Sequence, residues 1–204
     1  MKYFNKSKIF NLLLLTLTLI IFFLLINYNL KKNKEHFQSS LPSCPTSANN
    51  STVTIPSGTK NIPSFYYMNC RDLTGLKFEA GSNLRTISAY AFYNSDLGGT
   101  ITFPASVEKI GSAAFLKLQS ITGLEFEAGS NLRTIDRYAF GETGIQGTIT
   151  IPASVEKIGR ESFSLCMSIT GLEFEAGSNL TTIGIAAFTG CSNLETIEIP
   201  KTVT

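Results

Sequence analysis

The sequence predicts an α/β-type repeat solenoid with short parallel β-strands, preceded by one transmembrane helix. Three observations predict it: a long apolar run near the amino terminus, a block of sequence that returns at a fixed offset, and a pair of alternating apolar residues that opens each repeated unit. The chain divides into a short basic tail (1–8), a membrane-spanning signal anchor (9–30), a flexible stalk (31–51) and a repeat domain (52–204).

The charges are unevenly distributed along the 204 residues. Residues 1–36 contain six lysines against the single acidic residue Glu35, whereas residues 52–204 contain eleven basic and fourteen acidic residues. The basic residues therefore flank the apolar run and do not indicate a nucleic-acid surface.

The apolar run Ile9–Leu30 has 22 residues, which as a helix span about 33 Å, enough for a hydrocarbon core of about 30 Å. No small-residue cleavage site follows it, because residues 27–31 read Asn-Tyr-Asn-Leu-Lys. We therefore expect an uncleaved signal anchor, with a removed signal peptide as the alternative. The apolar run has three lysines on each side, so the count of positive charges does not decide its orientation in the membrane. The free amino terminus favours the inner side of the membrane, which places the repeat domain outside. An intracellular scaffold tethered to the membrane stays an alternative.

The stalk is rich in Ser, Pro and Asn, which is typical of a flexible linker. Asn49 and Asn50 each begin an Asn-x-Ser/Thr triplet. We expect both to be glycosylation acceptors if the domain enters a glycosylating secretory route.

Two kinds of unit alternate in the repeat domain. The block Gly75–Ile87 returns at 123–135 with one change and, at the same offset again, at 171–183 with two, while Thr100–Gly111 returns at 148–159 with one change. These blocks define six units and a partial seventh at 196–204. Short units occupy 52–74, 100–122 and 148–170, and slightly longer units, called long units below, occupy 75–99, 123–147 and 171–195.

Each unit opens with a period-2 apolar pair such as Ile149 and Ile151, which predicts a short strand with one buried face. An isoleucine follows, and five residues after it an aromatic residue. The six pairs are Ile62/Tyr67, Ile87/Phe92, Ile110/Phe115, Ile135/Phe140, Ile158/Phe163 and Ile183/Phe188. A single unit buries too little to fold alone, so the units must stack, with equivalent side chains one above another.

The segments Ile151-Pro-Ala-Ser-Val-Glu-Lys-Ile-Gly159 and Ala187–Pro200 resemble the BspA-like class of leucine-rich repeats. The resemblance covers residues 52–204 and recurs in every unit. Departures are Tyr67 for the expected Phe, Pro63 for Gly, and Ser162 for Ala. The resemblance implies a leucine-rich-repeat arc in a cell-surface or secreted binding protein without enzymatic activity.

The residue inventory points away from an enzyme. The single histidine, His36, lies in the stalk, so the repeat domain has no histidine for a catalytic triad or a metal site. The sequence also contains no glycine-rich phosphate loop and no nucleophile–base constellation. We therefore expect neither a cofactor nor a metal ion.

The outward strand face is the predicted binding surface. One row holds Thr54, Lys77, Thr102, Glu125, Thr150, Glu173 and Glu198, and in the next row Glu79, Glu127 and Glu175 alternate with prolines. The candidate ligand-binding residues are Thr102, Glu125, Glu127, Thr150, Glu173 and Glu175. Carboxylates of successive long units lie about 9–10 Å apart, too far to share one calcium ion. We expect a protein or glycan partner and no nucleic acid. The alternative is a solvated face on a spacer or display rod that has no ligand.

The cysteines and the carboxyl end leave alternatives open. Cys166 and Cys191 occupy one position in adjacent units, so a disulfide between them is possible, as is Cys44–Cys70. The alternative is buried thiols that pack as small apolar groups. The partial seventh unit covers the sixth poorly, which predicts possible self-association at that edge.

Two further rows lie at the surface. Arg85, Glu108, Arg133 and Glu156 form a row of alternating charge that we expect to fix the register. Tyr90 and Tyr138 repeat at the outer rim, where we expect half-buried packing.

Overall fold

A computed structural model describes residues 43–45 and 51–204. Within these ranges no helix is long and apolar enough to cross a membrane. The expected membrane span at 9–30 and the expected glycosylation sites Asn49 and Asn50 lie outside the described residues. The membrane anchor and the glycosylation therefore stay predictions.

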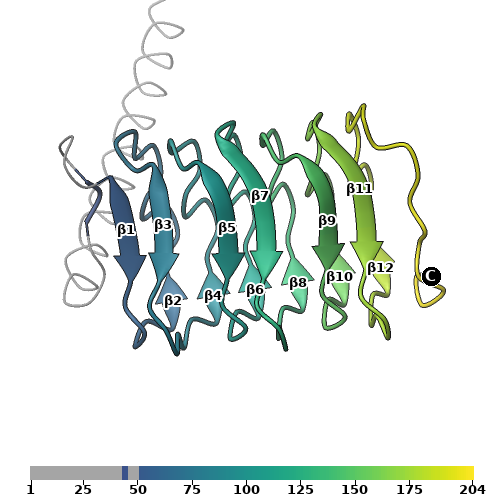
Figure 1. Cartoon of the computed structure of the whole chain (residues 1–204), viewed down its shortest axis with the longest axis horizontal. Coiled ribbons are helices and arrows are strands. Elements are labelled where there is room, and N and C mark those ends of the chain that lie inside the picture. Colours follow the sequence, from purple (N-terminus) through teal and green to yellow (C-terminus); the bar gives the residue numbers. More distant parts are fainter. Residues whose placement is uncertain (1–42, 46–50) are drawn as a thin grey trace, which may run out of the picture. The chain divides into compact units, whose positions relative to one another are not determined.

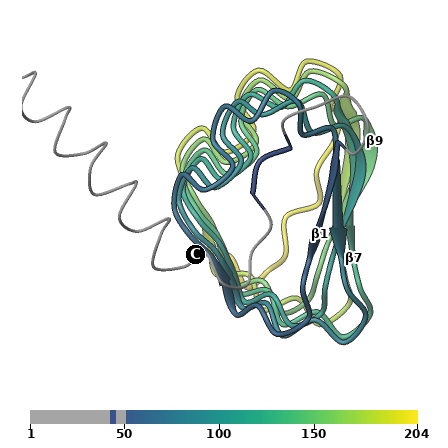
Figure 2. The same ribbon diagram turned by 90° about the vertical axis from the view of Figure 1, so that its left-hand side faces the viewer.

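The repeat domain is a parallel β-solenoid in which each coil contributes one longer strand and one two-residue strand (Figure 1). The longer strands are β1 (Thr52–Ile55), β3 (Gly75–Phe78), β5 (Gly99–Phe103), β7 (Ile121–Phe126), β9 (Gly147–Ile151) and β11 (Ile169–Phe174). The two-residue strands are β2 (Asn61–Ile62), β4 (Thr86–Ile87), β6 (Lys109–Ile110), β8 (Thr134–Ile135), β10 (Lys157–Ile158) and β12 (Thr182–Ile183). Figure 2 looks along the stack and shows the coils superimposed, with the longer strands together on one side.

The repeat offset sets the register of the strands. The longer strands pair in parallel as β1 with β3, β5 with β7 and β9 with β11, so that Thr102 stands opposite Glu125 and Phe103 opposite Phe126. The two-residue strands form one parallel sheet in the order β12-β10-β8-β6-β4-β2, with the isoleucines of neighbouring units aligned. The predicted parallel stacking of the repeats into a solenoid is therefore confirmed.

The third side of each coil consists of turns, and the expectation of an α/β-type fold is wrong here because the described residues contain no helix. Tyr90, Phe92 and Asn94 donate their main-chain N–H groups to carbonyls of the next coil at 2.9, 2.8 and 3.0 Å. Tyr90 and Asn94 have positive φ values of 58° and 54°. A helix needs its N–H groups for its own carbonyls and right-handed φ throughout, so this lateral ladder excludes one.

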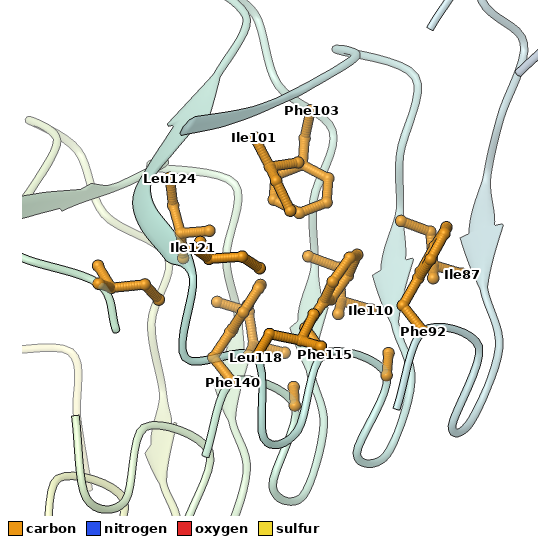
Figure 3. Packing of buried hydrophobic residues seen from close by; sticks show 14 of the residues in the cluster. Ile87, Phe92, Ile101, Phe103, Ile110, Phe115, Leu118, Ile121, Leu124 and Phe140 are labelled. Atoms are coloured by element: carbon orange, nitrogen blue, oxygen red, sulfur yellow. The ribbon is translucent and has the colours of Figure 1, made fainter. Parts of the chain in front are cut away.

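The core contains a continuous aromatic column. Its members are Tyr67, Phe92, Phe115, Phe140, Phe163 and Phe188, whose successive ring centroids lie 5.0, 5.1, 5.3, 5.3 and 5.5 Å apart in stacked geometry. Figure 3 shows Phe92, Phe115 and Phe140 of this column beside the isoleucines of the two-residue strands. Phe140 is fully buried, as the repeat register predicts.

The two unit types fit each other through a threonine and a glycine. Gly123 stands beside Thr100 of the preceding strand, and a Cβ atom added to Gly123 would lie only 2.8 Å from the Thr100 hydroxyl oxygen. Gly171 meets Thr148 in the same way at 2.6 Å. The glycine that opens each long unit is therefore required by the threonine of the short unit before it.

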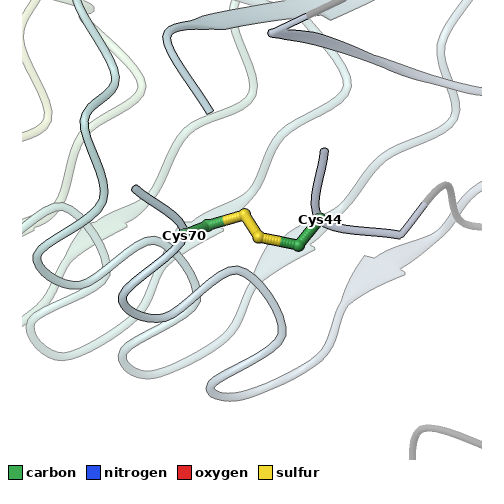
Figure 4. The surroundings of a disulfide bond; sticks show 2 residues. All are labelled: Cys44 and Cys70. Atoms are coloured by element: carbon green, nitrogen blue, oxygen red, sulfur yellow. A yellow bond between two sulfur atoms is a disulfide. The ribbon is translucent and has the colours of Figure 1, made fainter. Parts of the chain in front are cut away.

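The disulfide joins Cys44 to Cys70, with Cα atoms 5.9 Å apart (Figure 4). Cys166 and Cys191 are not bonded to each other: both are free, buried thiols, as the alternative of thiols packed as small apolar groups predicts. Each thiol donates to a main-chain carbonyl of the preceding coil at 3.1 Å, Cys166 to Phe140 and Cys191 to Phe163. A thiol at this position satisfies a buried acceptor that a disulfide would leave without that donor.

Candidate functional site

The strand face presents the predicted row of polar side chains to solvent. Thr102, Glu125, Thr150 and Glu173 are all exposed on the longer strands. The Thr102 hydroxyl donates to the Glu125 carboxylate at 2.8 Å, and Thr150 stands opposite Glu173 in the same register. The second and third pairs of units therefore each present one hydroxyl beside one carboxylate, whereas the first pair places Lys77 opposite Thr54.

Glu127 and Glu175 have a structural role that the strand pattern does not predict. The Glu127 carboxylate accepts the main-chain N–H of Ala105 at 3.0 Å, and that of Glu175 accepts from Ala153 at 2.9 Å. Glu79 does the same for Ser57 at 2.8 Å. These glutamates therefore close the turn that follows the preceding strand. The signal in the sequence was their recurrence one unit after each proline-containing turn.

At the carboxyl end the strand face is hollowed. An open hollow lies between β11 and residues 196–202, and its lining includes Glu173, Glu175, Glu198 and Lys201. The final segment pairs with β11 at only one isolated bridge, Leu172 with Ile197. Glu173 and Glu175 thus border this hollow, whereas Thr102 and Glu125 lie on regularly paired strands.

The predicted row of alternating charge forms discrete pairs. Arg85 contacts Glu108 at 2.5 Å and Arg133 contacts Glu156 at 2.6 Å, each from a long unit to the following short unit. The two arginine side chains are largely exposed and the two glutamates about half exposed, so each pair contributes at most about 1 kcal/mol. The pairs help to hold the register and do not form an acid–base site.

A second surface, on the turn side, lies where the sequence analysis expected only half-buried packing. We call it the turn-side groove, and its lining includes Phe65, Met68, Tyr90, Tyr93, Leu116 and Tyr138. Phe65 and Tyr90 stack at 5.2 Å, and the Arg137 guanidinium lies 4.7 Å from the Tyr138 ring centre. The pKa of the Glu161 carboxyl lies below its ordinary value. The largest cause is its hydrogen bond with Tyr138, and the second is its hydrogen bond with Arg160.

Metal-binding groups do not gather in this part of the chain. Among residues 43–45 and 51–204, no three His, Cys, Asp or Glu side chains come together in a way that could hold a metal ion. The chemistry available at either surface is therefore hydrogen bonding, charge and apolar contact.

The repeat domain matches a known family and a solved structure. The BspA type leucine rich repeat region matches in six copies over residues 42–170 and 124–204. No curated protein matches the chain. The structure of the pneumococcal vaccine antigen PcpA is 25% identical, with a TM-score of 0.61, over 75% of this chain and 51% of that one.

Two more solved structures are similar. A leucine rich cell surface protein from Faecalibacterium prausnitzii is 23% identical over 75% of this chain and 48% of that one, with a TM-score of 0.44. A leucine-rich repeat protein from Bacteroides ovatus is 18% identical over 74% and 67%, with a TM-score of 0.29. The chain spans about half the length of the first two proteins. By its six matched copies, the chain belongs to the BspA-type leucine-rich repeat family.

Proposed function

We propose that this protein is a membrane-anchored binding protein, displayed at the cell surface, whose strand face takes a protein or glycan partner. The observation that carries the proposal is the exposed row of Thr102, Glu125, Thr150 and Glu173 on regularly paired strands. Parallel strands about 4.8 Å apart hold such groups at fixed spacing. A fixed array costs little ordering entropy when a partner binds.

The character of the row sets the class of partner. Hydroxyl and carboxylate groups alternate, and the face has no apolar side chain among these four residues. A basic peptide segment or a polyhydroxylated glycan complements such a surface, and the negative charge argues against nucleic acid. Glu127 and Glu175 already accept main-chain N–H groups, so they flank the binding surface and do not make the main contacts with the partner. The expected affinity is modest and decreases with salt.

Display outside the cell has two further supports. The disulfide between Cys44 and Cys70 suits an oxidising compartment. The similar pneumococcal protein carries the description of a vaccine antigen, which suits a repeat domain that antibodies reach. The apolar run at 9–30 would supply the anchor.

The test is binding of the full chain to cells. We expect Glu125→Lys combined with Glu173→Lys to weaken binding at least tenfold, because both charges of the row are reversed. The matched control is Asp72→Lys combined with Glu195→Lys, which changes the net charge equally at exposed positions outside the row. If the strand-face variant binds as well as the parent, the domain is a spacer or display rod without a ligand on this face.

A further inference from the structure

The turn-side groove exposes rings that the fold does not need. Phe65 and Tyr90 are 36% and 37% exposed. In other units the same backbone position is held by Ala113 and Ala186, and all four residues have positive φ between 54° and 63°. A bulky residue is uncommon in this left-handed region, and the alanines show that the turn forms without a ring. The turn geometry therefore does not require the aromatic residues.

The aromatic rings of the turn-side groove offer a ligand their edges and the spaces between them. Phe65 and Tyr90 are parallel within 5° at a centroid distance of 5.2 Å, and Tyr93 meets Tyr90 edge-on at 5.7 Å. Phe65 and Tyr90 thus use a face on each other, and Arg137 covers a face of Tyr138. A sugar ring stacks flat on a free aromatic face, whereas the smaller pyrrolidine ring also packs against part of a ring. The groove therefore suits proline better than a pyranose.

The spacing between equivalent tyrosines of the groove matches the repeat length of one peptide backbone conformation. Tyr90 and Tyr138 are equivalent residues of successive long units, two coils apart, which corresponds to about 9.6 Å along the stack. A polyproline II helix repeats every three residues, or about 9.3 Å. An extended β-strand repeats every two residues, at about 6.6–6.8 Å, which does not match the spacing of the tyrosines. Prolines three residues apart would therefore meet equivalent parts of the groove.

The polar groups of the groove suit such a ligand. A polyproline II chain makes no internal hydrogen bonds, and its prolines have carbonyl acceptors but no N–H donors. The groove supplies donor groups, since Lys117 and Tyr93 are among its lining residues. The Glu142 carboxylate lies among the same lining residues and would accept a basic residue of the segment. Aromatic grooves with polar rims are a recurring way to bind this conformation.

We propose that the turn-side groove is a second binding site, separate from the strand face, and that its ligand is a proline-rich peptide segment in the polyproline II conformation. Lys117 and the Tyr93 hydroxyl bind the carbonyls of the segment, while its prolines pack against Phe65, Tyr90 and Leu116. The site needs no part of the strand-face row.

The test is calorimetric titration of the full chain with a short oligoproline peptide. The parent binds it, and Tyr90→Ala combined with Tyr138→Ala weakens the affinity at least tenfold. This variant keeps its fold because Ala113 and Ala186 occupy the same position in other units, and its melting temperature checks that. The matched control is Met167→Ala, an exposed apolar residue that does not line the groove. The strand-face double variant binds the peptide like the parent.

Three outcomes would overturn the proposal. The first is failure of the folded parent to bind oligoproline at millimolar concentration. The second is equal binding by the parent and the tyrosine double variant. The third is binding of a soluble oligosaccharide, lost in the double variant, while oligoproline does not bind, which would assign the groove to a glycan.

Discussion

The Glu175 carboxylate accepts the main-chain N–H of Ala153 at 2.9 Å and so ties one coil to the turn of the coil before it. We expect Glu175→Ala to lower the free energy of unfolding by about 0.5–1.5 kcal/mol, the usual net contribution of such a bond. The matched control is Glu173→Ala, on the same strand but directed at the strand-face row, which should change stability by less than about 0.5 kcal/mol. Denaturant unfolding of both variants measures the difference. Equal effects would mean that the bond to Ala153 contributes nothing.

Phe140 is fully buried between Phe115 and Phe163, at 5.3 Å from each ring. We expect Phe140→Ala to cost about 3–5 kcal/mol, because the column leaves a cavity that its neighbours cannot close. Urea unfolding measures the loss. A loss below about 1 kcal/mol, the level of an ordinary surface change, would contradict the continuous column.

The ionisation of the Cys191 thiol makes the free energy of unfolding depend on pH. Burial, and secondarily the neighbouring Cys166, raises the pKa of the Cys191 thiol from 9.0 to about 11. Well below pH 9 the thiol is protonated in the folded and the unfolded chain, so it adds no pH dependence there. Between about pH 9 and 11 the unfolded thiol ionises first, so stability falls as the pH rises.

The measurement is the melting temperature of the parent and of Cys191→Ala between pH 8 and 11. We expect a shallower decline in the variant, since burial also raises the pKa of Tyr67 and leaves a residual slope of the same sign. Parallel declines would show that Cys191 ionises equally in both states.

Much of the fold could be predicted because the repeat constrains it. A constant offset between equivalent units leaves few ways to align Ile135 with Ile110 and Phe140 with Phe115, and the structure has both alignments. The expectation of helices within the repeat units was wrong because nothing in the pattern distinguishes a short helix from turns whose N–H groups bond to the next coil. That choice depends on φ at residues such as Tyr90, which side-chain periodicity does not report.

The candidate site was predicted only in outline. Period-2 alternation places Glu125 and Glu173 on the outer face, and both are exposed there. It cannot show that Glu127 bends toward the Ala105 amide, since this contact joins residues 22 positions apart through a turn. The pattern also does not reveal the turn-side groove, because Tyr90 and Tyr138 each resemble an isolated rim residue, whereas the groove is a property of several coils together.

The topology is tested on intact cells that carry the full chain. We expect protease to remove the repeat domain from outside, and amino-terminal sequencing to find the chain uncleaved before Leu30. Alkylation without reductant should modify Cys166 and Cys191 after unfolding but leave Cys44 and Cys70 blocked. Four reactive thiols together with protection from protease would instead indicate the intracellular scaffold.

The fit between Thr100 and Gly123 determines how this domain can change in length. Excision of residues 100–122 alone would bring two long units together, so that Gly123 would lose the methyl and hydroxyl it packs against and Glu127 would stand beside Glu79 in place of Pro104. Excision of 100–147 would instead restore every neighbour, because residue 148 begins a short unit identical in role to the one at 100. Recombination between copies therefore yields folded products only in steps of two units. Natural length variants of this domain should differ by whole pairs, each made of one short and one long unit.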